Sequence, residues 1–488
     1  MTQSGTAQVY IGADVLEIMS VAMYAEPLVI YRELVQNAAD SIESAILAKL
    51  ISADMAKVRV SFDQATRTAS CYDNGAGLSN DLFDAQMLSF GASGKRATSF
   101  RGFRGIGRLA GLGQCKNLVF RSRAKGDKFV REATWSAIRL RELLASKEII
   151  ELQELARESV SLREFRATDE ESHFFEVRLE GLRRLGDDRL FDPHRISAFL
   201  GEVAPVPFST DFRHGSQIRE ELLRRGPLLE LELTVADKLV VKPYREVIEA
   251  RAGRNAKISE IEFVELPALN SGTAAYGWIA HHDYFGALRR DSPGRGLRVR
   301  SGNLQIGDEN ILAQAFPEER FNSWTVGEFH VFDAHLRPNA RRDAFEPSLH
   351  VDNLYNQLRP HAASIARRCR NESKQRNCSR RLMAVSTELD SIESTVGREL
   401  SPFSATLRKM VGTTMMETLA ELTEDVKDER TIEEIARIKA RAIKLSRRGE
   451  TKAPSARERG RLDVLSWLHH NANPDLFSEA VRAMRKIK

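Results

Sequence analysis

Apolar residues recur at every third or fourth position between residues 12 and 50. That spacing places them along one side of a helix, so it predicts a helix over this segment. The positions that set the pattern are Leu28, Val29, Leu34, Val35, Ala38, Ile42, Ala45 and Ile46. The next segment, VRVSFDQATRTASCYDNGAGLS, contains two runs of strand-forming residues and predicts two strands around a turn.

The pattern beyond these elements divides the chain into three regions. In residues 1–212, strands alternate with a charged helix, and the run VAPVPFSTDF closes the region. Residues 213–358 contain the strand-like runs LELELTV, GLRVRSGNLQIG and GEFHVFD between helix-like stretches, an α+β pattern. Residues 359–488 are almost wholly helix-like, with a polar linker near 447–460. We therefore expect a multidomain α+β protein with a helical C-terminal region.

The composition is that of an ordinary globular protein, with 42% hydrophobic and 29% charged residues. It excludes disordered and collagen-like classes, and no apolar run reaches the 18 or so residues of a membrane span. The four cysteines form no CxxC pair, and the N-terminal segment lacks the features of a signal peptide. We expect a cytoplasmic protein without a membrane partner.

The formal net charge of +5 is unevenly distributed. Residues 359–488 carry 27 Lys or Arg against 18 Asp or Glu, a balance of +9, which leaves about −4 for the first 358 residues. The basic cluster within 359–381 is typical either of a solvated helical tail or dimerisation bundle, or of a surface that binds nucleic acid.

Three polar residues, Glu33, Asn37 and Asp40, interrupt the apolar pattern of the first helix. Their spacing of i, i+4, i+7 places them on one face. Taken alone, such a stripe is typical of a solvated helix face, but two glycine-rich motifs follow it in the chain.

Asp73, Gly75 and Gly77 form a DxGxG motif at the end of a predicted strand. Paired glycines permit a tight turn, and a carboxylate there can accept hydrogen bonds from an exocyclic amine. A simple turn or a calcium loop is the alternative, although calcium needs further acidic ligands. Later in the chain, Gly102, Gly105 and Gly107 form GxxGxG, whose amides can converge on phosphate oxygens.

Taken in order, ELVQNAAD, DNGAG and GFRGIGRLAG resemble the N-box and the two glycine boxes of the GHKL ATPase superfamily. YRELVQNAADS and FLGEVAPVPF are most similar to the heat-shock protein 90 chaperones and their bacterial HtpG relatives. The resemblance implies an N-terminal Bergerat (GHKL) α/β sandwich that binds ATP and Mg²⁺, followed by an α+β middle domain of chaperone type.

The resemblance also implies roles for individual residues. Glu33 matches the general base that polarises the attacking water, Asn37 matches the Mg²⁺ ligand, and Asp40 matches a supporting position behind them. Asp73 matches the carboxylate that binds the adenine amino group, with Gly75 and Gly77 beside the base. The expected Gly-Thr pair near the last strands is missing from SHFFEVRLEGL, which puts one contact near the adenine in doubt.

The segment 91–113 matches the ATP lid. Lys95 is expected to reach a phosphate, and the backbone amides of the stretch after Gly102 are expected to cradle the triphosphate, namely those of Arg104, Gly105, Ile106 and Gly107. Arg108 stands where chaperones usually have an aromatic residue, and it either adds a phosphate contact or is exposed.

In the middle region, RFNSWTVGEFHVFDAHLRPNARRDAFE resembles the catalytic-arginine loop of the chaperones. Asn339 and Arg342 match the Asn and the γ-phosphate Arg of that loop, and Arg341 is the neighbouring candidate. An arginine from a second domain makes hydrolysis conditional on domain closure. Alternatively, Asn339 and Arg342 anchor the loop through Asp333 or Asp343.

The resemblance thus implies an ATPase that converts ATP and water to ADP and phosphate, slowly and only in the right conformation. We expect it to work as a homodimeric clamp or chaperone on an unknown client protein. One alternative is a GHKL ATPase whose clamp closes on nucleic acid, as in MORC-like or mismatch-repair proteins, and which works within a bacterial defence or DNA-handling system. The other is a regulatory nucleotide sensor with negligible turnover.

Overall fold

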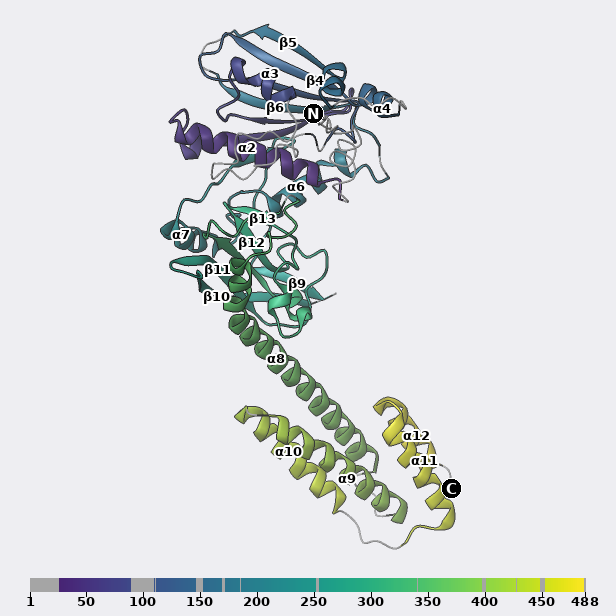
Figure 1. Ribbon diagram of the computed structural model, residues 1–488. Coiled ribbons are helices and arrows are strands. Elements are labelled where there is room, and N and C mark those ends of the chain that lie inside the picture. Colours follow the sequence, from purple (N-terminus) through teal and green to yellow (C-terminus); the bar gives the residue numbers. More distant parts are fainter. Residues whose placement is uncertain are drawn as a thin grey trace, which may run out of the picture. The chain divides into compact units, whose positions relative to one another are not determined.

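The computed structural model describes residues 26–88, 109, 111–145, 152–168, 172–184, 186–251, 254–339, 341–396, 401–426, 428–447 and 453–486. The chain forms two compact units, Met1–Ala366 and Arg367–Lys488, and the division falls within the long helix α8 (Leu349–Val396). Figure 1 shows the elements in sequence order along the ribbon, and each unit is described below by itself.

The first unit contains an eight-stranded mixed sheet in the order β5-β4-β3-β6-β2-β1-β7-β8. Neighbouring strands are antiparallel except for β1 and β7, which pair in parallel. The strands are β1 (Lys57–Asp63), β2 (Thr68–Asp73), β3 (Asn117–Arg123), β4 (Phe129–Ser136), β5 (Val160–Arg166), β6 (Phe174–Glu180), β7 (Glu232–Val235) and β8 (Lys238–Leu239). The two strands predicted around the turn after residue 56 are confirmed as β1 and β2.

Helices accompany this sheet, and their apolar positions join the strands in one core. Val35 and Ile42 of α2 are buried in the same cluster as Val58 of β1 and Phe120 of β3. The helix predicted over residues 12–50 is confirmed from Val29 to Leu47, while residues 12–25 lie outside the described part. The helices are α2 (Val29–Leu47), α3 (Asn80–Leu88), α4 (Ala137–Ala145), α5 (Leu152–Ser159) and α6 (Pro193–Val203). A further helix, α7 (Gly215–Arg225), instead buries Ile218 and Leu222 in the core of a second sheet.

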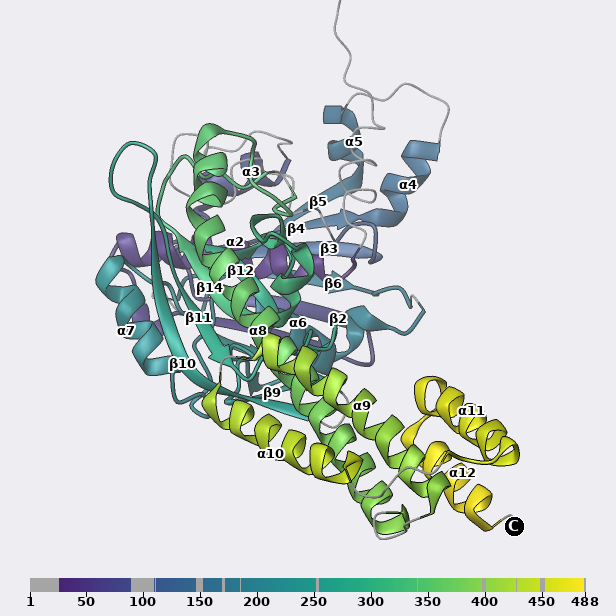
Figure 2. The ribbon, with the colours of Figure 1, turned by 90° about the horizontal axis from the view of Figure 1, so that it is seen from below.

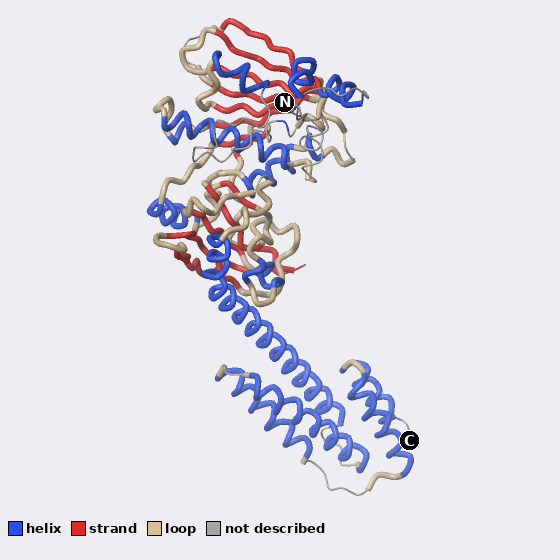
Figure 3. Tube along the Cα trace, in the orientation of Figure 1, coloured by secondary structure: helices blue, strands red, loops and turns tan. Residues whose placement is uncertain are grey.

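A second sheet of six strands follows, in the order β13-β12-β14-β11-β10-β9. Strands are red in Figure 3. The runs GLRVRSGNLQIG and GEFHVFD form strands as predicted. LELELTV, which the sequence grouped with the middle region, instead forms β7 of the first sheet, so that sheet extends beyond the boundary predicted near Phe212. The strands are β9 (Val247–Arg251), β10 (Arg254–Pro267), β11 (Thr273–His282), β12 (Gly296–Ser301), β13 (Leu304–Ile306) and β14 (Val326–Val331).

In the described part of the second unit every secondary-structure element is a helix (Figure 2). Its helices bury a common core of Leu, Ile, Val, Met and Phe side chains. The predicted linker near 447–460 extends less far than expected, because a capping box of Ser455 and Glu458 begins a helix at Ala456. Besides the second half of α8, the helices are α9 (Pro402–Asp425), α10 (Glu429–Ser446), α11 (Ala456–Asn471) and α12 (Pro474–Lys486). Among the described residues, no helix has the length and apolar character needed to cross a bilayer.

Candidate functional site

The polar stripe of α2 lies inside the first unit. The side chains of Glu33 and Asp40 are buried, and Asn37 is half-buried between them. Burial of two carboxylates costs free energy unless a ligand or a polar partner compensates it. The alternative of a solvated helix face is therefore wrong, and the three residues share a face that points into the protein.

The DxGxG turn packs directly against the end of this stripe. Asp73 is the last residue of β2, and its Oδ1 accepts a hydrogen bond of 2.9 Å from the Gly75 amide. The Ala76 amide donates to the Ser41 carbonyl at 3.1 Å, one residue after Asp40 on α2. The structure thus brings together the first two predicted motifs, which are 33 residues apart between Asp40 and Asp73.

Gly77 is required by the geometry of the turn. Its φ is +67°, and a Cβ atom there would lie 2.1 Å from the Arg123 carbonyl oxygen. Any other residue would be strained and would collide with β3. A calcium loop would need further acidic ligands at this turn, and the one group of three or more His, Cys, Asp or Glu ligands in the described ranges lies elsewhere, between the end of β14 and the start of α8.

Asp73 is buried without a cationic partner among the groups acting on it. Burial raises the pKa of its carboxyl from 3.8 to about 7, while the Gly75 amide and the Ser41 hydroxyl oppose that rise only in part. A carboxylate in such a place is poised to gain a hydrogen-bond donor from a ligand, because the donor would restore the solvation that folding removes.

Two further residues support the turn, and the sequence did not identify them. His173 contacts the Gly75 carbonyl through Nδ1 at 2.6 Å, and the buried Ser122 hydroxyl accepts a 2.7 Å hydrogen bond from the Leu78 amide. Both come from strand regions remote in sequence, so no local pattern points to them.

Phe175 pairs with Asp73 across β6 and β2, and no Gly-Thr pair is present in β6.

The predicted phosphate-binding loop lies almost entirely outside the described residues. Lys95, Gly102, Arg104, Gly105, Ile106, Gly107 and Arg108 all fall there, and within 91–113 the structure describes only residues 109 and 111–113. The roles predicted for these seven residues remain predictions.

The predicted arginine loop forms a tight turn after β14. The Asn339 amide donates to the Ala344 carbonyl at 2.9 Å, and the Arg342 amide donates to the Asn339 carbonyl at 3.2 Å. Arg342 has a φ of +56°, and its carbonyl accepts a hydrogen bond from the Gly307 amide. The Asn339 side chain donates to Asp343 at 2.6 Å, so this asparagine anchors the loop.

Arg32 links the arginine loop to the polar stripe. Its guanidinium donates to the Arg341 carbonyl at 2.8 Å and lies 3.3 Å from Glu33 Oε1. Arg32 and Arg341 are 309 positions apart in the chain. Arg32 was not among the residues predicted from the sequence, although its place directly before Glu33 in a buried helix is a usable signal, because a buried arginine needs partners.

A second link joins the two sheets near the end of α6. Arg300 of β12 donates to the Glu202 carbonyl at 2.6 Å and to the Ala204 carbonyl at 3.3 Å, which are among the last carbonyls of that helix. Arg300 also pairs with the fully buried Glu328, which Lys242 contacts at 2.7 Å. Burial alone would raise the pKa of Glu328, but Arg300 and Lys242 hold it well below its usual range.

The match to a known protein family covers the segment that carries the predicted motifs. The family described as "Histidine kinase-, DNA gyrase B-, and HSP90-like ATPase" matches residues 32–167. Chaperone protein HtpG of Polaromonas naphthalenivorans (strain CJ2) is 32% identical over 90 residues, which cover 17% of this chain and 14% of that protein. HtpG of Citrobacter koseri and of Salmonella typhimurium are each 26% identical over 142 residues, covering 25% of this chain and 23% of theirs. The chain matches less than a quarter of the length of these relatives.

Proposed function

Residues 32–167 belong to the superfamily of histidine kinase-, DNA gyrase B- and HSP90-like ATPases, and from that premise we propose that the chain is an ATP-hydrolysing conformational clamp of heat-shock protein 90 type. The observation that carries the proposal is the Arg32 side chain, which contacts both Glu33 and the backbone of the arginine loop. Such a link would couple the hydrolytic site to movement of the second sheet.

Asp73 would bind the adenine. Its buried carboxyl, with the pKa raised to about 7 by desolvation, would accept a hydrogen bond from the exocyclic amine. A Cβ atom on Gly75 would lie 2.7 Å from Asp73 Oδ1, so glycine there keeps room beside the carboxyl for a flat base, while Gly77 lets the turn pack closely on β3. A purine without that amine should bind less tightly, because the carboxyl would then stay buried and unsatisfied.

Glu33 and Asn37 would serve the phosphate end. Asn37 offers an amide oxygen of the kind that Mg²⁺ accepts, and this half-buried residue follows Glu33 by one helical turn. When bound, Mg²⁺ would neutralise charge on the phosphates. Glu33 would take a proton from water as the water oxygen bonds to the γ-phosphorus and the bond to the ADP oxygen breaks. Asp40, which is also buried, would help to hold the Glu33 and Asn37 side chains in position.

Arg342 would complete the site from the second sheet. A guanidinium near the γ-phosphate stabilises the charge that develops on the transferred group. Arg32 donates a hydrogen bond to the carbonyl of the residue before Arg342, so movement of the loop would also move the Arg32 side chain on α2.

We propose that the lid, residues 91–113, closes over the triphosphate and contacts it through Lys95 and the Arg104–Gly107 amides. We also propose that the working state is a cytoplasmic homodimer that acts on a client protein.

Paired alanine variants test these roles. Glu33→Ala should lower the ATP hydrolysis rate about 10²-fold or more and leave ATP affinity nearly unchanged, because a general base contributes that factor to turnover. Glu43→Ala, on the same helix but outside the stripe, is the matched control. Turnover at the parental rate in Glu33→Ala, with ATP bound, would show that Glu33 is not the base.

Arg342→Ala should likewise slow turnover about 10²-fold or more with little change in ATP affinity. Its control is Arg341→Ala, which removes an exposed side chain but keeps the carbonyl that Arg32 contacts. A large affinity loss in Arg342→Ala would instead place this residue in the ground-state binding pocket.

The second candidate function is a clamp on nucleic acid, favoured by one feature of α8. No residue of α8 between Cys369 and Cys378 is buried, and this stretch carries Arg370, Lys374 and Arg376 against the single acid Glu372. The deciding experiment measures ATP hydrolysis with DNA, with RNA and with an unfolded protein at low and moderate salt. Stimulation by nucleic acid that fades with salt would favour this candidate, and stimulation by unfolded protein would favour the chaperone.

A further inference from the structure

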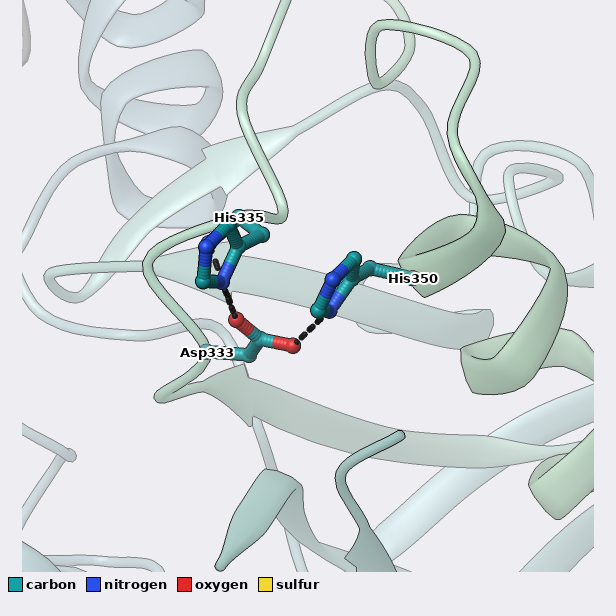
Figure 4. Close-up of side chains that lie close together, drawn as sticks. All are labelled: Asp333, His335 and His350. Atoms are coloured by element: carbon teal, nitrogen blue, oxygen red, sulfur yellow. Dashed lines mark hydrogen bonds and ion pairs between the residues drawn. The ribbon is translucent and has the colours of Figure 1, made fainter. Parts of the chain in front are cut away.

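Two histidines and an aspartate converge at the end of β14 (Figure 4). His335 Nδ1 lies 2.9 Å from Asp333 Oδ1, and His350 Nδ1 lies 2.6 Å from Asp333 Oδ2. The imidazole rings stack with centroids 4.3 Å apart and planes 18° from parallel. Within the ranges that the structure describes, no other group of three His, Cys, Asp or Glu residues brings its ligand atoms within 4.8 Å of one another.

The three residues close the base of the arginine loop. Asp333 and His335 precede the turn that carries Arg342, and His350 follows it as the second residue of α8. The Asp333 amide donates to the Ala274 carbonyl of β11 at 3.3 Å, which fixes the aspartate to the second sheet. Any interaction that holds the three side chains together therefore also holds the two ends of the loop together.

The donor set suits a borderline transition metal. Imidazole nitrogens and a carboxylate oxygen are the usual ligands of Zn²⁺, and three protein ligands leave a fourth position for water. The Asp333 side chain is 7% exposed and that of His350 18%, whereas His335 is 65% exposed and free to adjust. Adjustment is needed, because ligand atoms around a tetrahedral Zn²⁺ are about 3.3 Å apart.

The tautomers of the two imidazoles are compatible with such a site. Each ring now has its Nδ1 against a carboxylate oxygen and would donate its proton there. A neutral imidazole can carry that proton on Nε2 instead and present the Nδ1 lone pair to a metal, without any net release of protons. We propose that Asp333, His335 and His350 bind one Zn²⁺-class ion, which ties the two ends of the arginine loop together.

Bound metal would restrict the movement of residues 336–348. If the proposed ATPase function is correct, it would thereby tune how readily Arg342 reaches the nucleotide. Metal binding itself does not depend on that function, so the two can fail separately.

The test is a Zn²⁺ titration of the full chain at pH 7.5 against a chromophoric chelator, without nucleotide. We expect one Zn²⁺ per wild-type chain and at least tenfold weaker binding in His335→Gln, whose exposed side chain can be changed without disturbing the core. His194→Gln, an exposed histidine on α6, is the control and should bind as the wild type does. His350→Gln should repeat the loss.

Two spectroscopic measurements accompany the titration. Co²⁺ added to the wild-type chain should give the strong visible d–d bands of tetrahedral N/O coordination, and Zn²⁺ should slow amide hydrogen exchange in residues 336–348. Equal Zn²⁺ affinity in His335→Gln and wild type, or an absence of stoichiometric Zn²⁺ binding in the wild type, would overturn the proposal. In that case the cluster is a hydrogen-bonded clamp only.

Discussion

Two buried carboxylates of the first unit have opposite surroundings. Asp73 of the first sheet is acted on by a backbone amide and a hydroxyl, and burial raises its pKa to about 7. Glu328 of the second sheet faces Arg300 and Lys242 and accepts a 2.8 Å hydrogen bond from the Tyr244 hydroxyl. Those cations keep its pKa well below the usual range despite complete burial.

The difference separates a proposed binding group, Asp73, from a structural one, Glu328. A buried charge with its full set of partners has nothing left to offer a ligand, whereas a buried carboxyl without a cation is destabilising until a donor arrives. The network around Glu328 holds the end of α6 through Arg300, so it joins the sheets. Asp73 has no cation among the groups that act on it, and under the proposed function it would gain its partner from the ligand.

The largest expected effect is on Glu328. Glu328→Gln would leave Lys242 and Arg300 buried without their counter-charge, so we expect the free energy of unfolding to fall by about 3–5 kcal/mol. Urea unfolding followed by circular dichroism measures it. Glu260→Gln, an exposed glutamate on β10 of the same sheet, should change stability by less than about 0.5 kcal/mol. A loss below about 1 kcal/mol in Glu328→Gln would contradict the structural role.

Asp73→Asn should have its main effect on nucleotide recognition. Loss of a charge-assisted hydrogen bond of about 1.5–3 kcal/mol predicts ATP binding weaker by about tenfold to a hundredfold. Equilibrium titration with ATP and with ITP, which lacks the exocyclic amine, sharpens the test. The wild type should prefer ATP and the variant should lose that preference; an unchanged ATP-to-ITP ratio would remove Asp73 from the adenine site.

The same variant should be more stable than the wild type at high pH. The pKa of Asp73 is about 7 in the folded chain against 3.8 in the unfolded one. The folded state therefore binds the proton more tightly, and wild-type stability falls as pH rises from about 4 to 7, with the full penalty present above pH 7. Asp73→Asn should match the wild type near pH 4 and exceed it by roughly 4 kcal/mol at pH 8. Parallel stability curves for the two proteins would argue against a desolvated carboxyl.

The smallest effect is expected at Arg32, through which helix α2 contacts the arginine loop of the second sheet. Arg32→Gln removes the ion pair with Glu33 and weakens the bond to the Arg341 carbonyl, which should cost about 1 kcal/mol of stability. Under the proposed function it should also slow ATP hydrolysis severalfold while the ATP Kd stays within about twofold. Arg341→Ala, which keeps that carbonyl, should hydrolyse ATP at nearly the parental rate. If Arg32→Gln and Arg341→Ala slowed ATP hydrolysis equally, the contact between α2 and the arginine loop would not act through Arg32.

Local periodicity was enough to predict the first two motifs of the candidate site. The helical spacing of Glu33, Asn37 and Asp40 follows from 3.6 residues per turn, and Asp73, Gly75 and Gly77 follow a strand that its alternation identifies. Helical spacing and strand alternation are properties of short segments, so the amino-acid order alone determines them. The requirement for glycine at Gly77 is partly tertiary, because the Arg123 carbonyl of β3 excludes a side chain there.

Only the tertiary structure decided which distant segments meet. The placement of β7 beside β1, the contact of His173 with Gly75, and the Arg32 bond to Arg341 join residues far apart in the chain. Such contacts depend on how whole elements pack, and no local spacing encodes them. The same holds for Asp333, His335 and His350, because the loop must turn back at Arg342 before the three side chains converge.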